Sequence, residues 1–299
     1  MFYKNLLETI GNTPLIKIQR WHRTPQVNLF AKLEGQNPGG SIKDRVALYM
    51  LEKAEQSGTL THEQTILEAT SGNMGIALAL VAAQKSYKVK IVMSAAMSEE
   101  RKLILRSLGA ELLLTDPRLG TKGAIQYARQ LKNEHPKQYW FADQFNNPDN
   151  TEAHYMLTAP ELLREIKKID VLVVGIGTAG TLGGLAKRFR KDSPQTKIVG
   201  VIPPPGYKLQ GIQNPDQDFK GQLYDKSLID QQEEVSVKDA FKVVKELARS
   251  EGLFLGMSSG AVLFAAQKVA RSLTTGNIVA LLADRGEKYL STNLFNQAE

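Results

Sequence analysis

The sequence contains no cysteine, and this absence excludes several kinds of site at once. Without a thiol the chain forms no disulfide, holds no thiolate metal centre and has no cysteine nucleophile. A chain without disulfides suits a reducing compartment, so we expect a cytoplasmic location. The four histidines show no spacing typical of a metal site or of a Ser-His-Asp triad: His22, His62, His135 and His154. We therefore expect no metal.

Long apolar runs and blocks of one charge are also missing. No stretch approaches the length that spans a membrane, and the first five residues lack the apolar core of a signal peptide. Lys and Arg outnumber Asp and Glu by 38 to 31, but these cations are scattered and do not alternate with aromatic residues. We expect neither a membrane nor a nucleic acid as partner. The net charge of +7 indicates an anionic ligand or cofactor, or nothing specific.

What the chain does contain is an alternation of short apolar runs and amphipathic segments. Its 299 residues are enough for two lobes, each with its own core. The alternation predicts an α/β fold with mostly parallel sheets flanked by helices. We expect strands at 27–34, 64–69, 89–93, 111–114, 171–174, 197–202 and 278–282, helices near 46–54, 76–85, 98–108, 120–133, 153–167 and 237–250, and irregular structure over 206–234.

A glycine-rich turn, Asn37-Pro38-Gly39-Gly40, precedes the segment that organises the rest of the chain. Ser41 followed by Asp44 is typical of a capping box, so Lys43 is expected in the first turn of a helix. The helix dipole and burial would both lower the pKa of Lys43, as a lysine that attacks a carbonyl requires. The alternative is an exposed lysine on an ordinary capped helix.

Residues 175–180 match the pattern G-x-G-x-x-G between a strand and a helix. A dinucleotide site would also need an acidic residue at the end of the next strand, and that strand ends in Gly200-Val201-Ile202-Pro203. The hydroxyls of Thr178 and Thr181, with successive backbone amides, instead favour a terminal phosphate. Dinucleotide binding and a plain tight turn are the alternatives.

Two further loops, each just before an expected helix, contain residues with hydroxyl groups. Thr70-Ser71-Gly72-Asn73 could hold a carboxylate at a helix start, and an N-cap turn is the simpler interpretation. In Ser258-Ser259-Gly260, a buried hydroxyl could donate a hydrogen bond to a ring nitrogen, and a helix cap is again the alternative.

Together these segments resemble the pyridoxal-phosphate β-replacement enzymes of fold type II, and within them the cysteine synthases (O-acetylserine sulfhydrylases). The resemblance spans nearly the whole chain with its motifs in the family's order. It is carried by Gly11-Asn12-Thr13-Pro14-Leu15, Lys32-Leu33-Glu34, Asn37 to Arg45, Glu68 to Gly75, Gly177 to Thr181 and Gly256 to Gly260. Asp143 to Asn150 and Asp284-Arg285-Gly286 with Tyr289-Leu290-Ser291-Thr292 look most like the B-type isozyme.

The resemblance implies a role for each motif. Lys43 would bind the aldehyde of pyridoxal 5′-phosphate and later move the Cα proton. Asn73 would hydrogen-bond the ring oxygen of the cofactor, and Ser258 its pyridine nitrogen. The phosphate of the cofactor would be held by Gly177, Thr178, Ala179, Gly180 and Thr181. The carboxylate of the substrate would be held by Thr70, Ser71, Asn73 and Gln144.

The implied reaction is β-replacement, in which O-acetyl-L-serine and sulfide give L-cysteine and acetate through an aminoacrylate intermediate. A serine at the pyridine nitrogen fits this reaction, because a neutral hydroxyl makes the ring a weaker electron sink than a carboxylate would. Alternatives are O-phosphoserine or thiosulfate as substrate, a cystathionine β-synthase, and a non-catalytic member of the family. Two departures bear on this choice: Met74 replaces the usual threonine, and neutral Gln213 stands in a segment where B-type enzymes tend to carry arginine.

The resemblance also predicts the organisation of the protein. Residues 1–36 and 146–299 would form a larger cofactor-binding lobe, and residues 37–145 a smaller mobile lobe that carries the carboxylate loop. The smaller lobe would close when that loop is filled. We also expect a homodimer, as in the family.

Overall fold

The computed structural model describes residues 2–70, 72–217 and 221–295. Its strands are β1 (Leu15–Lys17), β2 (Val27–Leu33), β3 (Thr65–Ala69), β4 (Lys88–Ser94), β5 (Glu111–Thr115), β6 (Tyr139–Phe141), β7 (Val171–Gly175), β8 (Lys197–Ile202), β9 (Gln231–Glu234) and β10 (Gly276–Leu282). The longer helices are α1 (Lys43–Gln56), α2 (Asn73–Lys85), α3 (Glu99–Ser107), α4 (Gly120–Glu134), α7 (Gly180–Asp192), α8 (Val237–Ser250) and α9 (Met257–Ala270), with shorter α5 (Asp149–Ala153) and α6 (Ala159–Glu165).

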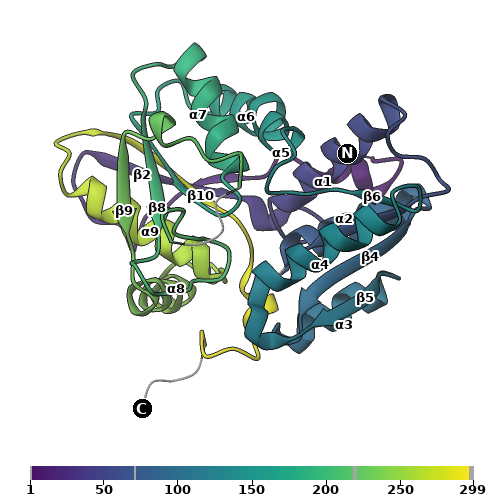
Figure 1. The fold of residues 1–299 in the computed structure, drawn as a ribbon. Helices are drawn as coiled ribbons and strands as arrows, with labels where there is room; N and C mark the ends of the chain where they lie inside the picture. Colours follow the sequence, from purple (N-terminus) through teal and green to yellow (C-terminus); the bar gives the residue numbers. More distant parts are fainter. Residues whose placement is uncertain (1, 71, 218–220, 296–299) are drawn as a thin grey trace.

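The strands form two separate sheets, which Figure 1 shows side by side. The larger sheet has the order β1-β2-β10-β7-β8-β9, and the smaller has the order β5-β4-β3-β6. All strand pairs are parallel except β1 with β2. The α/β fold with two mostly parallel sheets flanked by helices is therefore confirmed.

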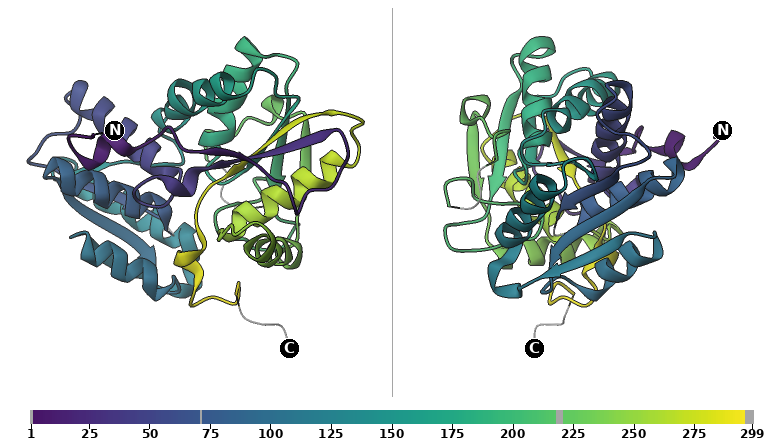
Figure 2. Two further views of the ribbon diagram at one scale, coloured as in Figure 1. Left: turned by 180° about the vertical axis from the view of Figure 1, so that it is seen from behind. Right: turned by 45° about the vertical axis from the view of Figure 1, so that its right-hand side comes forward.

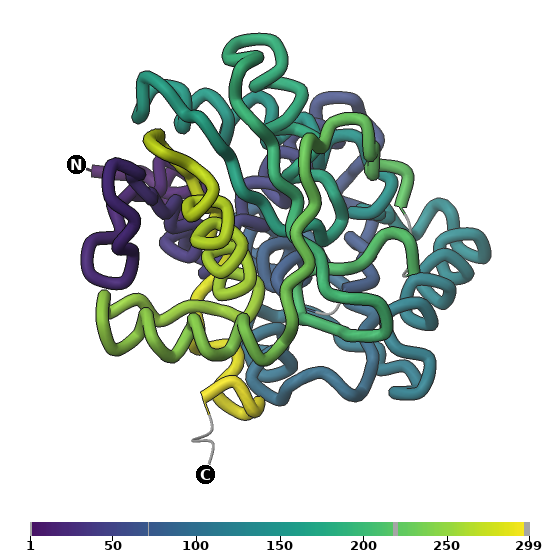
Figure 3. Tube along the Cα trace, turned by 90° about the vertical axis from the view of Figure 1, so that its left-hand side faces the viewer, coloured from purple at the N-terminus to yellow at the C-terminus, as the bar shows by residue number. Residues whose placement is uncertain are grey.

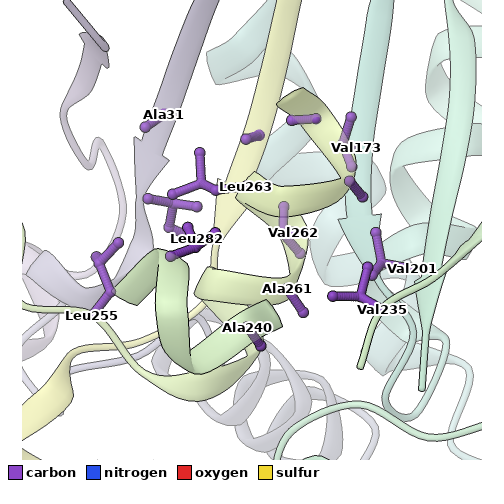
Figure 4. Close-up of a cluster of buried hydrophobic side chains, with 14 of the residues drawn as sticks. Ala31, Val173, Val201, Val235, Ala240, Leu255, Ala261, Val262, Leu263 and Leu282 are labelled. Atoms are coloured by element: carbon purple, nitrogen blue, oxygen red, sulfur yellow. The ribbon is translucent and has the colours of Figure 1, made fainter. Parts of the chain in front are cut away.

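Helices cover both faces of the larger sheet because its central strands are apolar on both sides. In β7, Val171 and Val173 face a core shared with α8 and α9, which Figure 4 shows in part. Leu172 and Val174 face the opposite core, shared with α6 and α7. Figure 3 shows α8 and α9 side by side, in green and yellow-green.

The smaller sheet is built in the same way. Ile66 and Ile91 pack on α1 and α2, whereas Leu67 and Val92 pack on α4. Helix α2 is buried along most of its length, because Met74 to Ala82 all lie inside this core. Helix α1 therefore packs mainly on α2, which lies between it and the smaller sheet. The first residue of α1, Lys43, lies between the two sheets.

Several predicted segments differ from the structure. The stretch 206–234, expected to be irregular, contains β9, which extends the larger sheet beside β8. Strands β1 and β6 were not predicted, since each has only three residues. The helix predicted over 153–167 runs over 149–165 and is divided into α5, a π-helical turn (His154–Thr158) and α6.

The predicted capping box at the start of α1 is wrong in its detail. Ile42, not Ser41, is the N-cap residue of this helix. The Ser41 hydroxyl accepts a hydrogen bond from the Lys43 backbone at 3.2 Å, and the Asp44 carboxylate accepts one from the backbone of Gly39 at 2.5 Å. Both side chains therefore accept from backbone N–H groups near the helix start, but not from those that a capping box would use.

A buried ionic network holds α1 against the larger sheet. The Arg45 guanidinium is 1% exposed and contacts Glu34 at 2.7 Å and Glu161 at 2.6 Å. Lys32 also reaches Glu161, at 3.1 Å, and the Thr13 hydroxyl donates to Glu34. These contacts fix the helix on which Lys43 lies. They also link this helix to the motifs that contain Thr13, Lys32 and Glu34.

The segment after β10 crosses from the larger sheet to α3, as the yellow trace in Figure 2 shows. Ser291 donates two hydrogen bonds to Glu100 of α3, and the guanidinium of Arg101 lies 4.8 Å from the ring centre of Tyr289. The C-terminal segment therefore connects the two halves of the molecule. Within the described part of the chain, no helix combines the length and apolarity needed to cross a bilayer.

Candidate active site

A cavity of about 760 Å³ lies between the two sheets. The starts of α1, α2, α7 and α9 all contribute residues to its wall. Among the lining residues are those that the sequence singled out: Lys43, Thr70, Asn73, Gln144, Gly177, Thr178, Ala179, Thr181 and Ser258. Gly180 adjoins this set as the first residue of α7, and Ser71 lies outside the described residues.

Lys43 is the first residue of α1 and is half-buried in the wall of the cavity. Burial lowers the pKa of its amine to about 8, although the charge of Glu68 raises it. A substantial fraction of the amine is therefore neutral at mildly alkaline pH, as attack on an aldehyde requires. The interpretation of Lys43 as an exposed surface lysine is excluded.

The loop before α7 has the shape of a phosphate cradle. Ala179 adopts a left-handed backbone conformation with φ 69° and is the N-cap of α7, which has no side-chain cap. A Cβ atom at Gly177 would lie 2.7 Å from the carbonyl oxygen of Gly211, and one at Gly180 would lie 2.2 Å from Oδ1 of Asn150. Only glycine fits at these two positions without displacing its neighbours, and the loop lies on the cavity wall at the start of α7, the positive end of a helix, which favours an anion.

Side chains from α5 and the π-helical turn orient the hydroxyls of this loop. Asn150 donates a 3.0 Å hydrogen bond to the Thr178 hydroxyl, and Nε2 of His154 lies 3.0 Å from the Thr181 hydroxyl. Burial keeps the pKa of His154 well below its usual value, and nearby Lys43 lowers it further, so the imidazole is neutral. The buried Oδ1 of Asn150 has no hydrogen-bond partner within the described chain.

Ser258 lies in the first turn of α9, on the wall of the cavity, and is 4% exposed. The N-cap of α9 is Gly256, so Ser258 is not the helix cap that the alternative interpretation required. Gly211 covers it closely, because a Cβ there would lie 3.1 Å from the Ser258 hydroxyl. The backbone N–H of Gln213 donates to Ile176 at 2.7 Å, which ties this segment to the phosphate loop.

Asn73 begins α2 and is held at both ends of its amide. Its Nδ2 donates to Asp284 at 2.7 Å, and its Oδ1 accepts from Lys288 at 2.9 Å. Burial lowers the pKa of Lys288, while the charges of Asp284 and Asp44 raise it. Tyr289 also donates to Asp284, at 2.7 Å. One N–H of Asn73 is left for a ligand in the cavity.

The loop before α2 lacks the hydroxyl cap that the simpler interpretation required. Its N-cap is Gly72, and no side chain caps the helix. The Thr70 hydroxyl accepts from the backbone of Gly72 at 3.1 Å and keeps its own O–H available. Arg101 packs behind the loop, because a Cβ at Gly72 would lie 2.8 Å from its Nε. The loop is therefore a positively polarised turn facing the cavity.

Gln144 follows β6 by three residues and is 5% exposed. It lines the cavity beside Ala69, which precedes the loop before α2, and is paired with Glu68, which is 1% exposed. Met74 also lines the cavity, and its side chain is almost fully buried. A thioether therefore occupies the position where the resembled family usually has a hydroxyl.

Sequence reasoning did not assign roles to the residues that support the site from behind. They are Glu68, Asn150, His154, Asp284 and Lys288, and Arg101 was likewise not assigned although it lines the cavity itself. Glu68, Asn150 and Asp284 lay within motifs that carried the resemblance, and this was the only available signal. The others reach the site through contacts between residues far apart in the chain.

Comparison with known proteins agrees with this geometry. The family model described as "Pyridoxal-phosphate dependent enzyme" matches residues 6–284. The chain belongs to this family. Its cofactor is pyridoxal 5′-phosphate, and the site fits that group: an amine of lowered pKa, a phosphate cradle closed to Cβ atoms and a buried serine share one cavity. In the structure described here, residues 2–70, 72–217 and 221–295, no group of three or more His, Asp or Glu side chains could hold a metal ion.

Individual relatives show which members of the family this chain is similar to. Cysteine synthase B of Escherichia coli (strain K12) is 40% identical over 293 residues, covering 98% of this chain and 96% of that protein. The structure of cysteine synthase from Entamoeba histolytica has a TM-score of 0.93 and 35% identity, covering 100% of this chain and 92% of that one. The structure of an O-ureido-L-serine synthase has a TM-score of 0.94 and 35% identity, covering 100% and 97%. This pyridoxal-phosphate enzyme is therefore similar both to cysteine synthases and to an O-ureido-L-serine synthase, whose names give different products.

Proposed function

We propose that this enzyme converts O-acetyl-L-serine and sulfide to L-cysteine and acetate by β-replacement. The observation that carries the proposal is that the Lys43 amine, with its pKa lowered to about 8, shares one cavity with the phosphate loop, Asn73 and Ser258. Similarity to the cysteine synthases of Escherichia coli and Entamoeba histolytica supports O-acetylserine as the substrate.

The cofactor would be held along the whole cavity. Lys43 would bind its aldehyde, Asn73 its ring oxygen and Ser258 its pyridine nitrogen. The phosphate would lie at the start of α7 against Gly177, Thr178, Ala179, Gly180 and Thr181. When bound, pyridoxal phosphate supplies an electron sink for removal of the Cα proton and loss of the β substituent.

The protein's own groups bind the substrate and move the proton. Thr70 and Asn73, at the start of α2, and Gln144 would bind the substrate carboxylate, and we extend this role to Ser71 from the sequence motif. The neutral amine of Lys43 would accept the Cα proton, since its pKa lies close to working pH. The half-buried position of Lys43 limits access of water to that proton.

We further propose that residues 37–145 form a smaller lobe that closes on residues 1–36 and 146–299. Arg101 of α3 donates to Gln210 at 2.6 Å, and Glu100 accepts from Ser291, so contacts across the cavity already exist. We also propose a cytoplasmic homodimer. The absence of cysteine suits a reducing compartment, and the exposed apolar side chains of Met156 and Leu157 would suit a subunit interface.

Borohydride reduction followed by peptide mass analysis tests the central assignment. We expect a pyridoxyl group on the peptide that contains Lys43, and none on the same peptide of a Lys43→Ala variant. Lys53, ten residues further along α1, serves as a matched control, because Lys53→Ala should leave the labelling of Lys43 intact. A pyridoxyl group on another lysine of the wild-type protein would contradict the proposal.

Turnover assays then separate the alternatives. We expect O-acetylserine with sulfide to be used better than O-phosphoserine, thiosulfate or homocysteine. A preference for homocysteine would indicate a cystathionine β-synthase. A colourless purified protein without turnover would indicate a non-catalytic member of the family.

A further inference from the structure

Glu68 is a buried acid that the reaction described above does not use. It lies in β3, where Leu67 and Ala69 pack toward α4, so Glu68 shares with Ile66 the face covered by α1 and α2. Its side chain is 1% exposed, and its neighbour across the sheet in β4 is the apolar Ile91. A carboxyl group in such surroundings needs a specific hydrogen-bond partner.

That partner is Gln144. Its Nε2 donates to Oε1 of Glu68 at 3.0 Å and to the carbonyl of Ala69 at 3.4 Å, and its backbone N–H donates to Oε2 of Glu68 at 3.4 Å. Both N–H groups of the Gln144 side chain therefore point to protein acceptors. In this arrangement the amide offers its carbonyl oxygen, which cannot bind a carboxylate.

Rotation of the Gln144 amide by half a turn would exchange these roles with little change in shape. Nε2 would then be free for a carboxylate in the cavity, and Oε1 would face Glu68. That arrangement needs a donor on Glu68, because a carboxylate and an amide carbonyl are both acceptors and a protonated acid is a donor. The protonation state of Glu68 and the orientation of Gln144 are thus coupled by hydrogen-bond chemistry.

The charged groups around Glu68 decide which state it adopts. The pKa of Glu68 is raised to about 8 mainly by burial; the hydrogen bonds from Gln144 oppose this rise, and the charge of Asp143 adds to it. The amine of Lys43, from the start of α1, is the facing cation. Asp143 is itself paired with Arg129 of α4 at 3.7 Å. With its pKa near 8, Glu68 lies close to the balance between its two protonation states, and the orientation of Gln144 described above is the one that suits the ionised state.

We propose that Glu68 is a positioning residue for the substrate. When Glu68 is protonated, it donates a hydrogen bond to Oε1 of Gln144, so that Nε2 points toward the substrate carboxylate. When Glu68 is ionised, it accepts a hydrogen bond from Nε2 instead. This inference rests on the proposed role of Gln144 in carboxylate binding. Substrate affinity should consequently fall as Glu68 loses its proton.

The test compares wild-type holoenzyme with Glu68→Gln. The variant side chain keeps the shape of the acid and can donate permanently from its amide, which removes the titration. We would measure the Kd of L-serine by calorimetry between pH 7 and pH 9.5. The ratio of the wild-type Kd to the variant Kd should rise by about thirtyfold over this range, because a group with a pKa of about 8 loses nearly all of its proton by pH 9.5. L-serinamide, which lacks the carboxylate, should show no such rise.

Proton uptake gives a second measurement, with the same two proteins and the same ligand. At pH 9, L-serine binding to the wild type should take up close to one more proton than L-serine binding to Glu68→Gln, as read from buffers of different ionisation enthalpy. A Kd ratio that stays constant with pH, or equal proton uptake by the two proteins, would overturn the inference.

A Gln144→Ala variant separates this inference from the proposal on which it rests. Weaker L-serine binding in Gln144→Ala, together with parallel pH curves for wild type and Glu68→Gln, would overturn only the role of Glu68. Unchanged L-serine binding in Gln144→Ala would overturn the role of Gln144 and that of Glu68 with it.

Discussion

Asp284 accepts a hydrogen bond from the amide of Asn73 at 2.7 Å, although 211 residues separate them in the chain. Asp284 follows β10 of the larger sheet, and Asn73 begins α2 beside the smaller sheet. Lys288 holds the other end of the same amide and also donates to the carbonyl of Gly39. The orientation of Asn73 is therefore set from the opposite side of the cavity, together with the turn that leads to Lys43.

Replacing Asp284 by alanine should weaken cofactor binding. The variant removes the acceptor that orients Asn73, and it removes the carboxylate whose charge raises the pKa of buried Lys288 most. We expect the Kd for pyridoxal phosphate to rise about tenfold, which corresponds to roughly 1.4 kcal/mol. Titration of the apoenzyme with the cofactor measures this change. Glu287→Ala, at a half-exposed acid in the same turn, is the control and should bind the cofactor as the wild type does.

Replacing Glu161 by glutamine should destabilise the fold in a pH-dependent way. Burial raises the pKa of Glu161, but the hydrogen bonds and charge of Arg45 outweigh it and lower the pKa to about 2. Since the folded-state pKa lies below the unfolded value near 4.5, the stabilisation is complete above pH 4.5. It is lost as the pH falls from 4.5 toward 2.

We expect Glu161→Gln to lower the free energy of unfolding at pH 7 by about 3 kcal/mol, because the buried cations Lys32 and Arg45 then lose a negative charge that they share. Urea unfolding at pH 7 and pH 3.5 measures it. The difference in unfolding free energy between wild type and variant should shrink at the lower pH. A difference that is constant with pH would mean that the ionic network does not supply this stability.

The strands and loops that face the cavity were predictable because each has a local signal. Lys43 follows a glycine-rich turn, and the phosphate loop lies between an apolar strand and a helix. Strand β9 has no such signal, because Gln231-Gln232-Glu233-Glu234 is polar and becomes a strand only by pairing with β8. The contacts of Asn73 with Asp284 and of Thr181 with His154 depend on the folded arrangement, so spacing could not reveal them.

Met74→Thr should change the affinity for O-acetylserine. Met74 lines the cavity directly after Asn73, so the substitution adds a hydroxyl beside the carboxylate loop and removes apolar bulk. We expect a lower KM for O-acetylserine, with a stability cost of about 2 kcal/mol from the space left in the core. Met74→Leu keeps the bulk without a hydroxyl and should leave KM near the wild-type value. Unchanged kinetics in Met74→Thr would show that the methionine does not tune substrate binding.

Gln213→Arg should shift substrate preference toward anionic serine derivatives. Gln213 is partly exposed on the cavity wall, and its backbone hydrogen bond to Ile176 fixes the segment from which a longer side chain would extend. A guanidinium there can bind a phosphate through two parallel hydrogen bonds, worth about 1.5–3 kcal/mol. We expect kcat/KM for O-phosphoserine to rise at least about tenfold, while that for O-acetylserine changes little. Gln213→Met, which is similar in length and uncharged, should give no gain. If wild-type enzyme already prefers O-phosphoserine, Lys208, a cation in the same wall, is the next residue to replace.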